Sequence, residues 1–175
     1  MNSANDVPFR QWALINQTEK ATVVTPLSGY RRHLFEDDPR ATYLEPNPTK
    51  EELGRVVLES LNISRFVDPR TDDAFFEADR IVAANKRWHA DFMTRFRYRS
   101  LRKAYENMLC CLAKRSEGRI TIRPYLRDRS PGYWTDMPEE RTVDIPATDD
   151  ISILGAATKL ALSRCEPQLR DRRPL

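Results

Sequence analysis

The stretch from residue 105 to residue 125 constrains the fold of this chain more than any other. Residues 108–113 form a nearly continuous apolar run, which is typical of a strand covered on both faces. Residues 119–123 alternate instead, so that Ile120 and Ile122 point to one side of a strand and the polar residues to the other. We therefore expect a hairpin at the centre of a sheet.

Turn chemistry between these two runs supports the hairpin. Residues 116–118 read Ser-Glu-Gly, and Gly118 tolerates the positive φ that a tight turn needs. Pro124 has no N–H to donate to a neighbouring strand, so it is expected to end the second strand.

Shorter β-favouring runs flank this centre. Residues 9–15 and 21–25 predict an N-terminal hairpin that ends at Pro26, and residues 41–44 and 142–145 predict two further strands.

Three helices are predicted by capping signals and apolar periodicity. Thr49 with Glu52 forms a capping box that opens a helix over residues 49–61. Trp88, Phe92 and Phe96 are spaced four residues apart and mark a helix over residues 83–96, with the aromatic stripe in the core. After Phe96, the run 95–99 switches to a period of two.

The third helix, over residues 149–165, follows the capping residues Thr148 or Asp149. Gly155 and Ala156 are expected to let this helix pack closely on the sheet. Together these elements predict a single α+β domain over residues 1–167, with a central mixed or antiparallel sheet and helices packed on it.

The composition agrees with one water-soluble domain. The chain has 175 residues, of which 40% are hydrophobic and 31% charged. No apolar run approaches the roughly 20 residues of a membrane helix, and the first residues lack the layout of a signal peptide, so we expect a cytoplasmic protein with no membrane partner. Residues 168–175 are expected to form a basic, flexible tail.

Cysteine and histidine give no metal-site signal. Cys110 and Cys111 are adjacent in the predicted strand and must face opposite sides of it, and Cys165 leaves an odd count. We expect buried, reduced thiols. With His33 and His89 as the two histidines and no Cys-x-x-Cys spacing, neither a metal nor a cofactor is expected.

The chain also lacks the usual traces of catalysis, namely a glycine-rich phosphate loop, a nucleophile elbow and paired histidines. No catalytic residue is assigned, and a non-enzymatic protein is expected. An enzyme would need a deep pocket that contains His33 or His89.

Charged residues are unevenly distributed. One stretch contains five basic residues, no acidic residue and two aromatic residues, Phe96 and Tyr98. Such a combination can neutralise phosphates and stack bases. The alternation of arginines and rings over residues 95–99 also fits a strand whose rings enter the core. Acidic clusters instead suit a basic partner, although each is also typical of a solvated turn or a helix start. The basic block consists of Arg95, Arg97, Arg99, Arg102 and Lys103, and the acidic clusters contain Glu36, Asp37, Asp38, Asp72, Asp73, Glu77 and Asp79.

Several of these residues, taken in order, resemble a known family. The pattern comprises Trp88, Tyr98, Tyr105-x-Asn107-Met108-x-x-Cys111, Ile120-x-Ile122-x-Pro124, Trp134, residues 143–146 as Val-Asp-Ile-Pro, and residues 154–165 as Leu-Gly-x-Ala-x-x-x-Ala-Leu-Ser-Arg-Cys. Over residues 51–165 the chain is similar to the immunity proteins of bacterial contact-dependent growth inhibition (CDI) systems.

This resemblance implies a small cytoplasmic α+β protein that binds its cognate toxin, the C-terminal region of the CdiA protein. Such toxins are commonly nucleases that act on transfer RNA, and the immunity protein blocks their active site or substrate surface. Direct nucleic-acid binding is then not expected. The alternative is a small RNA- or DNA-binding module that uses the basic block.

Overall fold

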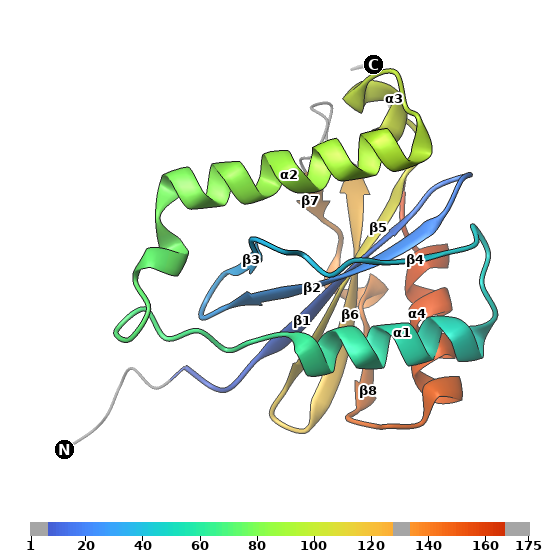
Figure 1. The fold of residues 1–175 in the computed structure, drawn as a ribbon. Coiled ribbons are helices and arrows are strands. Elements are labelled where there is room, and N and C mark those ends of the chain that lie inside the picture. Colours follow the sequence, from blue (N-terminus) through green and yellow to red (C-terminus); the bar gives the residue numbers. More distant parts are fainter. Residues whose placement is uncertain (1–6, 128–133, 167–175) are drawn as a thin grey trace, which may run out of the picture.

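The computed structural model describes residues 7–127 and 134–166, and it confirms the α+β fold (Figure 1). One antiparallel sheet has the strand order β3-β2-β1-β5-β6-β7, while β4 pairs with β2 beside β3, and β8 pairs with β6 beside β7. The strands are β1 Gln11–Gln17, β2 Thr22–Gly29, β3 His33–Phe35, β4 Thr42–Leu44, β5 Leu109–Ser116, β6 Arg119–Arg127, β7 Trp134–Asp136 and β8 Val143–Pro146. The helices are α1 Lys50–Ile63, α2 Ala78–Phe96, α3 Leu101–Tyr105 and α4 Ile151–Ser163, with 3-10 turns at Ala74–Phe76 and Glu139–Arg141.

The predicted central hairpin is confirmed as β5 and β6. Glu117 and Gly118 connect the two strands, and both have positive φ values, 51° and 73°. This two-residue turn matches the right-handed twist of the strands. The other edge of β5 pairs with β1, so the hairpin lies in the middle of the sheet.

The two prolines expected to end strands do not end them. Pro26 pairs with Ala13 inside β2, and Pro124 pairs with Cys111 inside β6. Two short strands share the outer edge of β2: β4 pairs with residues 22–24 and β3 pairs with residues 27–29. Two others share the outer edge of β6: β8 pairs with residues 119–122 and β7 pairs with residues 125–127. Each proline therefore lies in a gap between two outer strands, where a missing N–H facing the gap removes no ladder hydrogen bond.

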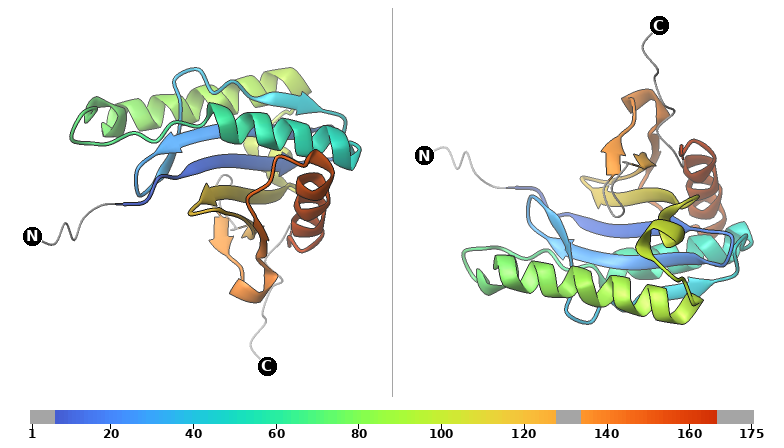
Figure 2. Two further views of the ribbon diagram at one scale, coloured as in Figure 1. Left: turned by 90° about the horizontal axis from the view of Figure 1, so that it is seen from below. Right: turned by 90° about the horizontal axis from the view of Figure 1, so that it is seen from above.

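Alternating side chains divide between the two faces of the sheet. One face packs against α1 and α4 in a core that includes Ile15, Val24, Leu53, Ile122 and Leu154. The other face packs against α2 and α3 through Val23, Trp88, Phe92 and Met108. Figures 1 and 2 show α2 crossing the sheet, with α1 and α4 lying together apart from it. Trp88, Phe92 and Phe96 pack as the predicted aromatic stripe.

A pair of glycines brings α1 and α4 together. A Cβ atom on Gly54 would lie 1.8 Å from the carbonyl oxygen of Ile151, and one on Gly155 would lie 1.7 Å from that of Lys50. Gly155 therefore permits close packing on α1 and not on the sheet, and Ala156 is exposed, which corrects the expected role of both residues.

Most helix boundaries follow the predicted signals. The capping box of Thr49 and Glu52 is present, with Thr49 Oγ1 accepting from the Glu52 N–H at 3.2 Å. At α4, Asp150 and not Asp149 is the N-cap, because its carboxylate accepts hydrogen bonds from the N–H groups of Ser152 and Ile153.

The remaining differences are local. Helix α2 begins at Ala78, five residues before the prediction, and residues 95–99 form the end of α2 and a loop in place of a period-two strand. Strands β3 and β7 were not predicted. The tail predicted at residues 168–175 lies outside the described residues.

Candidate functional site

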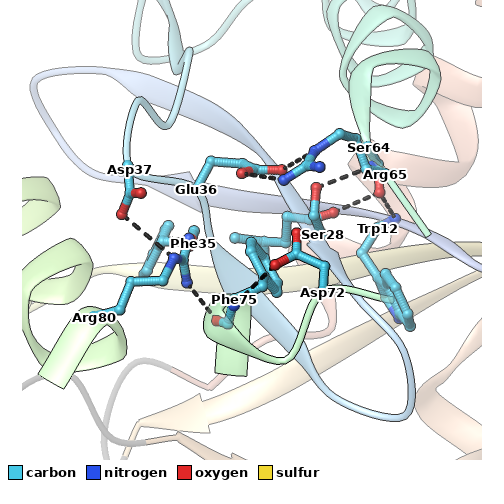
Figure 3. A network of polar contacts seen from close by, with 11 residues as sticks. Trp12, Ser28, Phe35, Glu36, Asp37, Ser64, Arg65, Asp72, Phe75 and Arg80 are labelled. Carbon is cyan, nitrogen blue, oxygen red and sulfur yellow. Dashed lines mark hydrogen bonds and ion pairs between the residues drawn. The ribbon is translucent and has the colours of Figure 1, made fainter. Parts of the chain in front are cut away.

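The predicted acidic residues come from two segments that the fold places side by side. Glu36, Asp37 and Asp38 follow the edge strand β3, whereas the second group lies between α1 and the first turns of α2. Arg65 and Arg80 connect the segments, as Figure 3 shows. We call the joint region the acidic surface: Glu36, Asp37, Asp38, Asp72, Asp73, Glu77 and Asp79.

Arg65 binds Glu36 through a bidentate ion pair. Its Nε and Nη2 atoms lie 2.7 and 2.9 Å from the two carboxylate oxygens. Burial by itself would raise the pKa of Glu36, but hydrogen bonds from Arg65 and Ser28 and the positive charges of Arg65 and Arg80 outweigh burial and lower it. Glu36 is therefore held as a carboxylate that fixes the loop after β3.

Arg80 fixes the other segment. Its guanidinium donates to the carbonyl oxygen of Phe35 at 2.8 Å and to that of Phe75 at 2.9 Å, and it lies 4.0 Å from the centre of the Phe75 ring. The side chain is only 14% exposed, and its Nε lies 3.4 Å from an oxygen of Asp37. Arg80 therefore ties β3, the Ala74–Phe76 turn and α2 into one rigid unit.

The end of α1 anchors this unit to the sheet. Ser64 accepts a hydrogen bond from the Trp12 N–H at 2.9 Å and donates to the carbonyl oxygen of Leu27, and the Arg65 N–H donates to Ser28 Oγ at 2.9 Å. Figure 3 shows these contacts beside the pair of Glu36 and Arg65. The backbone next to the acidic residues is thus fixed to the sheet.

Some of the acidic side chains are held by partners within the protein. Glu36 and Asp37 pair with arginines, and Asp72 accepts a hydrogen bond from the Phe75 N–H at 3.3 Å. The others are exposed to solvent, namely Asp38, Asp73, Glu77 and Asp79. The acidic residues could be predicted from the sequence, but Arg65 and Arg80 could not, since no local pattern separates them from other surface arginines.

A second feature is a pocket of about 350 Å³ on the sheet face that α2 covers. Strands β1, β2, β3, β5, β6 and β7 and helices α2 and α3 all contribute to its wall. The lining residues are Leu14, Asn16, Leu27, His33, Leu34, Phe35, Asn85, Trp88, His89, Tyr105, Cys110, Tyr125 and Trp134.

The pocket contains both histidines singled out in the sequence, so the location demanded by an enzyme hypothesis exists. His89 Nε2 and the Tyr105 hydroxyl lie 2.7 Å apart, and burial lowers the pKa of His89. Burial also raises the pKa of Tyr125 to about 12 and raises that of Cys110. No Asp, Glu, Lys or Arg is among the lining residues within the described chain. The pocket therefore presents neutral polar groups and aromatic rings, which suits an uncharged or apolar occupant.

The basic block surrounds the turn from α2 into α3. All five of its residues are exposed, and Lys20 reaches it from the β1–β2 turn, where Nζ donates to the carbonyl oxygen of Phe96 at 2.7 Å. Lys103 pairs with Glu106 at 2.7 Å, and the Arg95 guanidinium lies 4.0 Å from the centre of the Tyr43 ring. The basic block and the acidic surface use different segments of the chain.

Residues 7–127 and 134–166 contain no group of three or more His, Cys, Asp or Glu side chains that could hold a metal ion. In the same ranges, no helix combines the length and apolarity needed to span a bilayer.

Known proteins share both the sequence and the fold. The immunity protein CdiI-YPIII of Yersinia pseudotuberculosis serotype O:3 is 27% identical over 176 residues, covering 93% of this chain and 99% of that protein. A solved structure of the protein of unknown function NMB0488 from Neisseria meningitidis has a TM-score of 0.82 at 25% identity, covering 93% of this chain and 99% of that one. One chain of the solved CdiA-CT/CdiI toxin and immunity complex from Yersinia pseudotuberculosis has the same fold, with a TM-score of 0.82 at 21% identity, covering 92% of this chain and 100% of that one.

The sequence profile of the family described as CdiI, CDI immunity protein, matches residues 11–165. This match begins at the first residue of β1, ends two residues after α4, and includes the whole sheet and both cores. The chain belongs to the family of CDI immunity proteins.

Proposed function

We propose that this protein protects the cell that makes it by binding the cognate CdiA C-terminal toxin domain in the cytoplasm. The observation that carries the proposal is the family match over residues 11–165. The related fold in a complex with a CdiA C-terminal domain supports the same partner class. Binding is stoichiometric and requires no catalytic residue of this chain.

The toxin is a nuclease, and the immunity protein covers its active site or its substrate surface. An enzyme that handles RNA offers a basic surface to phosphates. An inhibitor that presents carboxylates to the same surface competes with the substrate, and complementary charge accelerates the encounter.

The acidic surface is the proposed docking region for that toxin. Arg65 and Arg80 hold its backbone through the contacts in Figure 3, while Asp38, Asp73, Glu77 and Asp79 remain exposed. A surface that is rigid before binding loses little conformational entropy on association. Loops carry most of these residues, which permits sequence change without loss of the fold.

We propose that the pocket on the face of the sheet covered by α2 receives one uncharged side chain of the toxin. Aromatic anchors that fill desolvated pockets dominate the energy of many protein interfaces. Leu34→Trp would fill this space without adding charge. We expect toxin affinity to fall at least about tenfold while the melting temperature stays unchanged, and retained affinity in a folded variant would remove the pocket from the interface.

The central experiment joins the chain to the toxin domain encoded immediately upstream of it. We expect the two proteins to co-purify as a one-to-one complex and toxin activity on transfer RNA to stop at one equivalent of the immunity protein. Intact activity in the presence of a folded excess would contradict the proposal. Inhibition of a toxin that attacks another substrate would contradict only its nuclease part.

The second candidate function is nucleic-acid binding by the basic block. It is favoured by the exposure of all five of its cationic side chains around one turn, together with Lys20. A gel shift of transfer RNA by the toxin-free protein, weakened by salt and lost on neutralising Arg97, Arg99 and Arg102, would support this function. The toxin-capture proposal predicts no such shift at physiological salt.

A further inference from the structure

Two of the three cysteines lie against each other, although they are far apart in sequence. Cys111 Sγ and Cys165 Sγ are 3.3 Å apart and 54 positions apart in the chain. A disulfide has an S–S distance of about 2.05 Å, so the sulfurs need to approach by only about 1.3 Å. Cys110 points to the opposite face of β5 and lines the pocket, so it is not part of this pair.

Regular structure holds both cysteines in place. Cys111 lies in the middle of β5, paired with Ile15 on one side and Pro124 on the other. Cys165 lies two residues after the end of α4: its N–H donates to the Leu162 carbonyl oxygen at 3.1 Å, and the next residue, Glu166, forms a parallel bridge with Leu126. The short sulfur contact thus follows from two fixed backbone positions.

We propose that Cys111 and Cys165 form a reversible disulfide when the surrounding pool of small thiols becomes oxidised. The bond would fasten the end of α4 to the centre of the sheet. It would also enclose β6, β7, β8 and α4 in one covalent loop. This modification site is independent of toxin recognition.

The two thiols have different roles in the reaction. Cys165 is partly exposed, and the hydrogen bond from Cys111 lowers the pKa of Cys165 against the opposing effect of burial. Cys111 is buried, and burial raises its pKa. External reagents therefore meet Cys165 first, and Cys111 resolves the product.

The oxidant is a low-molecular-weight disulfide of the glutathione type. The Cys165 thiolate attacks one sulfur, the S–S bond of the reagent breaks, one glutathione thiolate leaves, and a mixed disulfide remains on Cys165. Cys111 then attacks the Cys165 sulfur, the S–S bond of the mixed disulfide breaks, and the second glutathione leaves as a thiolate that takes up the proton lost by Cys111. In total, the two protein thiols lose two electrons and two protons and form one disulfide, and the small disulfide takes these up and becomes two thiols.

The test treats the full-length reduced protein with oxidised glutathione, followed by intact mass measurement and peptide mapping. We expect the loss of two hydrogen atoms, a Cys111–Cys165 cross-linked peptide, and one remaining alkylatable thiol, Cys110. The melting temperature should rise by about 5–10 °C and return after reduction.

Matched single variants separate the roles. Cys110→Ser should still form the cross-link, Cys111→Ser should accumulate the mixed disulfide on Cys165, and Cys165→Ser should gain no adduct. Any one of three results for the treated native protein would overturn the proposal: three alkylatable thiols, a cross-link that contains Cys110, or a lasting mixed disulfide on Cys165. The peptide map of the native protein decides the matter even if a variant fails to fold.

Discussion

Gly54 of α1 and Gly155 of α4 face each other where the two helices cross, and neither position has room for a Cβ atom. The added carbon would lie 1.8 or 1.7 Å from a backbone oxygen of the opposite helix. Because a backbone oxygen moves only with its helix, the helices would have to separate.

The variant Gly155→Ala should therefore destabilise the protein despite the higher helix propensity of alanine. We expect a loss of about 2 kcal/mol or more in the free energy of unfolding, measured by urea denaturation. The neighbouring exposed substitution Ala156→Met serves as the control and should change stability by less than about 0.5 kcal/mol. Equal effects of the two substitutions would show that the crossing can relax.

The helix start at Thr49 gives a second prediction. Thr49→Ala removes the side-chain oxygen that accepts from the Glu52 N–H and should cost about 1 kcal/mol of stability. Thr49→Ser keeps that oxygen and should restore most of the loss. If serine and alanine behave alike in thermal unfolding, capping is not the source of the effect.

The ion pair between Glu36 and Arg65 predicts a dependence of stability on pH. The pKa of Glu36 is lowered in the folded state, so its contribution is present above its ordinary pKa of about 4.3 and is lost as the pH falls through the lower folded value. Glu36→Gln should remove this part of the acid sensitivity and cost about 1 kcal/mol at neutral pH.

Glu59→Gln is the matched control, since Glu59 pairs with Arg55 on the exposed face of α1 at 3.0 Å with both side chains about half exposed. Its effect at neutral pH should stay below about 0.5 kcal/mol. Urea unfolding at pH 7 and at several values below 4.5 compares the three proteins. Parallel curves for the wild type and Glu36→Gln would contradict the assignment.

The acidic surface makes a prediction about toxin capture. Exchanging Asp38, Asp73, Glu77 and Asp79 for their amides should weaken toxin binding about 10–100-fold, chiefly through slower association, with an unchanged melting temperature. The difference from wild type should shrink as salt is added. Surface-immobilised toxin and a salt series measure both quantities.

A control with the same change in net charge exchanges Glu45, Glu139, Glu140 and Asp149, which are exposed on other segments. This variant should bind the toxin almost as well as the wild type. If both variants bind equally well, the toxin docks elsewhere. If both lose affinity equally, total charge and not the acidic surface is responsible.

Local chemistry explains which parts of the fold could be predicted. The turn at Glu117–Gly118, the capping box at Thr49 and the stripe from Trp88 to Phe96 each depend on neighbouring residues, and all were predicted correctly. The prediction that Pro26 and Pro124 end their strands was wrong. Whether a strand can contain a proline depends on which strands pair at its outer edge, and this pairing is a property of the whole sheet. Strands β3 and β7 could not be predicted for the same reason, because they are short and are defined by the strands with which they pair.

The candidate site shows the same limit. Runs of carboxylates can be read from the sequence, but their convergence depends on Arg65 and Arg80, whose partners lie 29 and 43 positions earlier in the chain. The lining residues of the pocket come from most elements of the fold, so no single segment of the sequence predicts the pocket. His33 and His89 were noticed only because the chain has two histidines.

The order of pairing in the sheet has a consequence for the timing of protection. Residues 11–17 pair with residues 109–115, and the core between α1 and the sheet is completed by α4, which lies roughly a hundred residues after α1. A chain emerging from the ribosome therefore cannot close its main core until its last helix has been made. We expect a premature stop codon before α4 to leave the bacterium as sensitive to the toxin of its siblings as complete deletion of the gene does. Every truncated product would lack one of the two helices, α1 and α4, that cover the same face of the sheet.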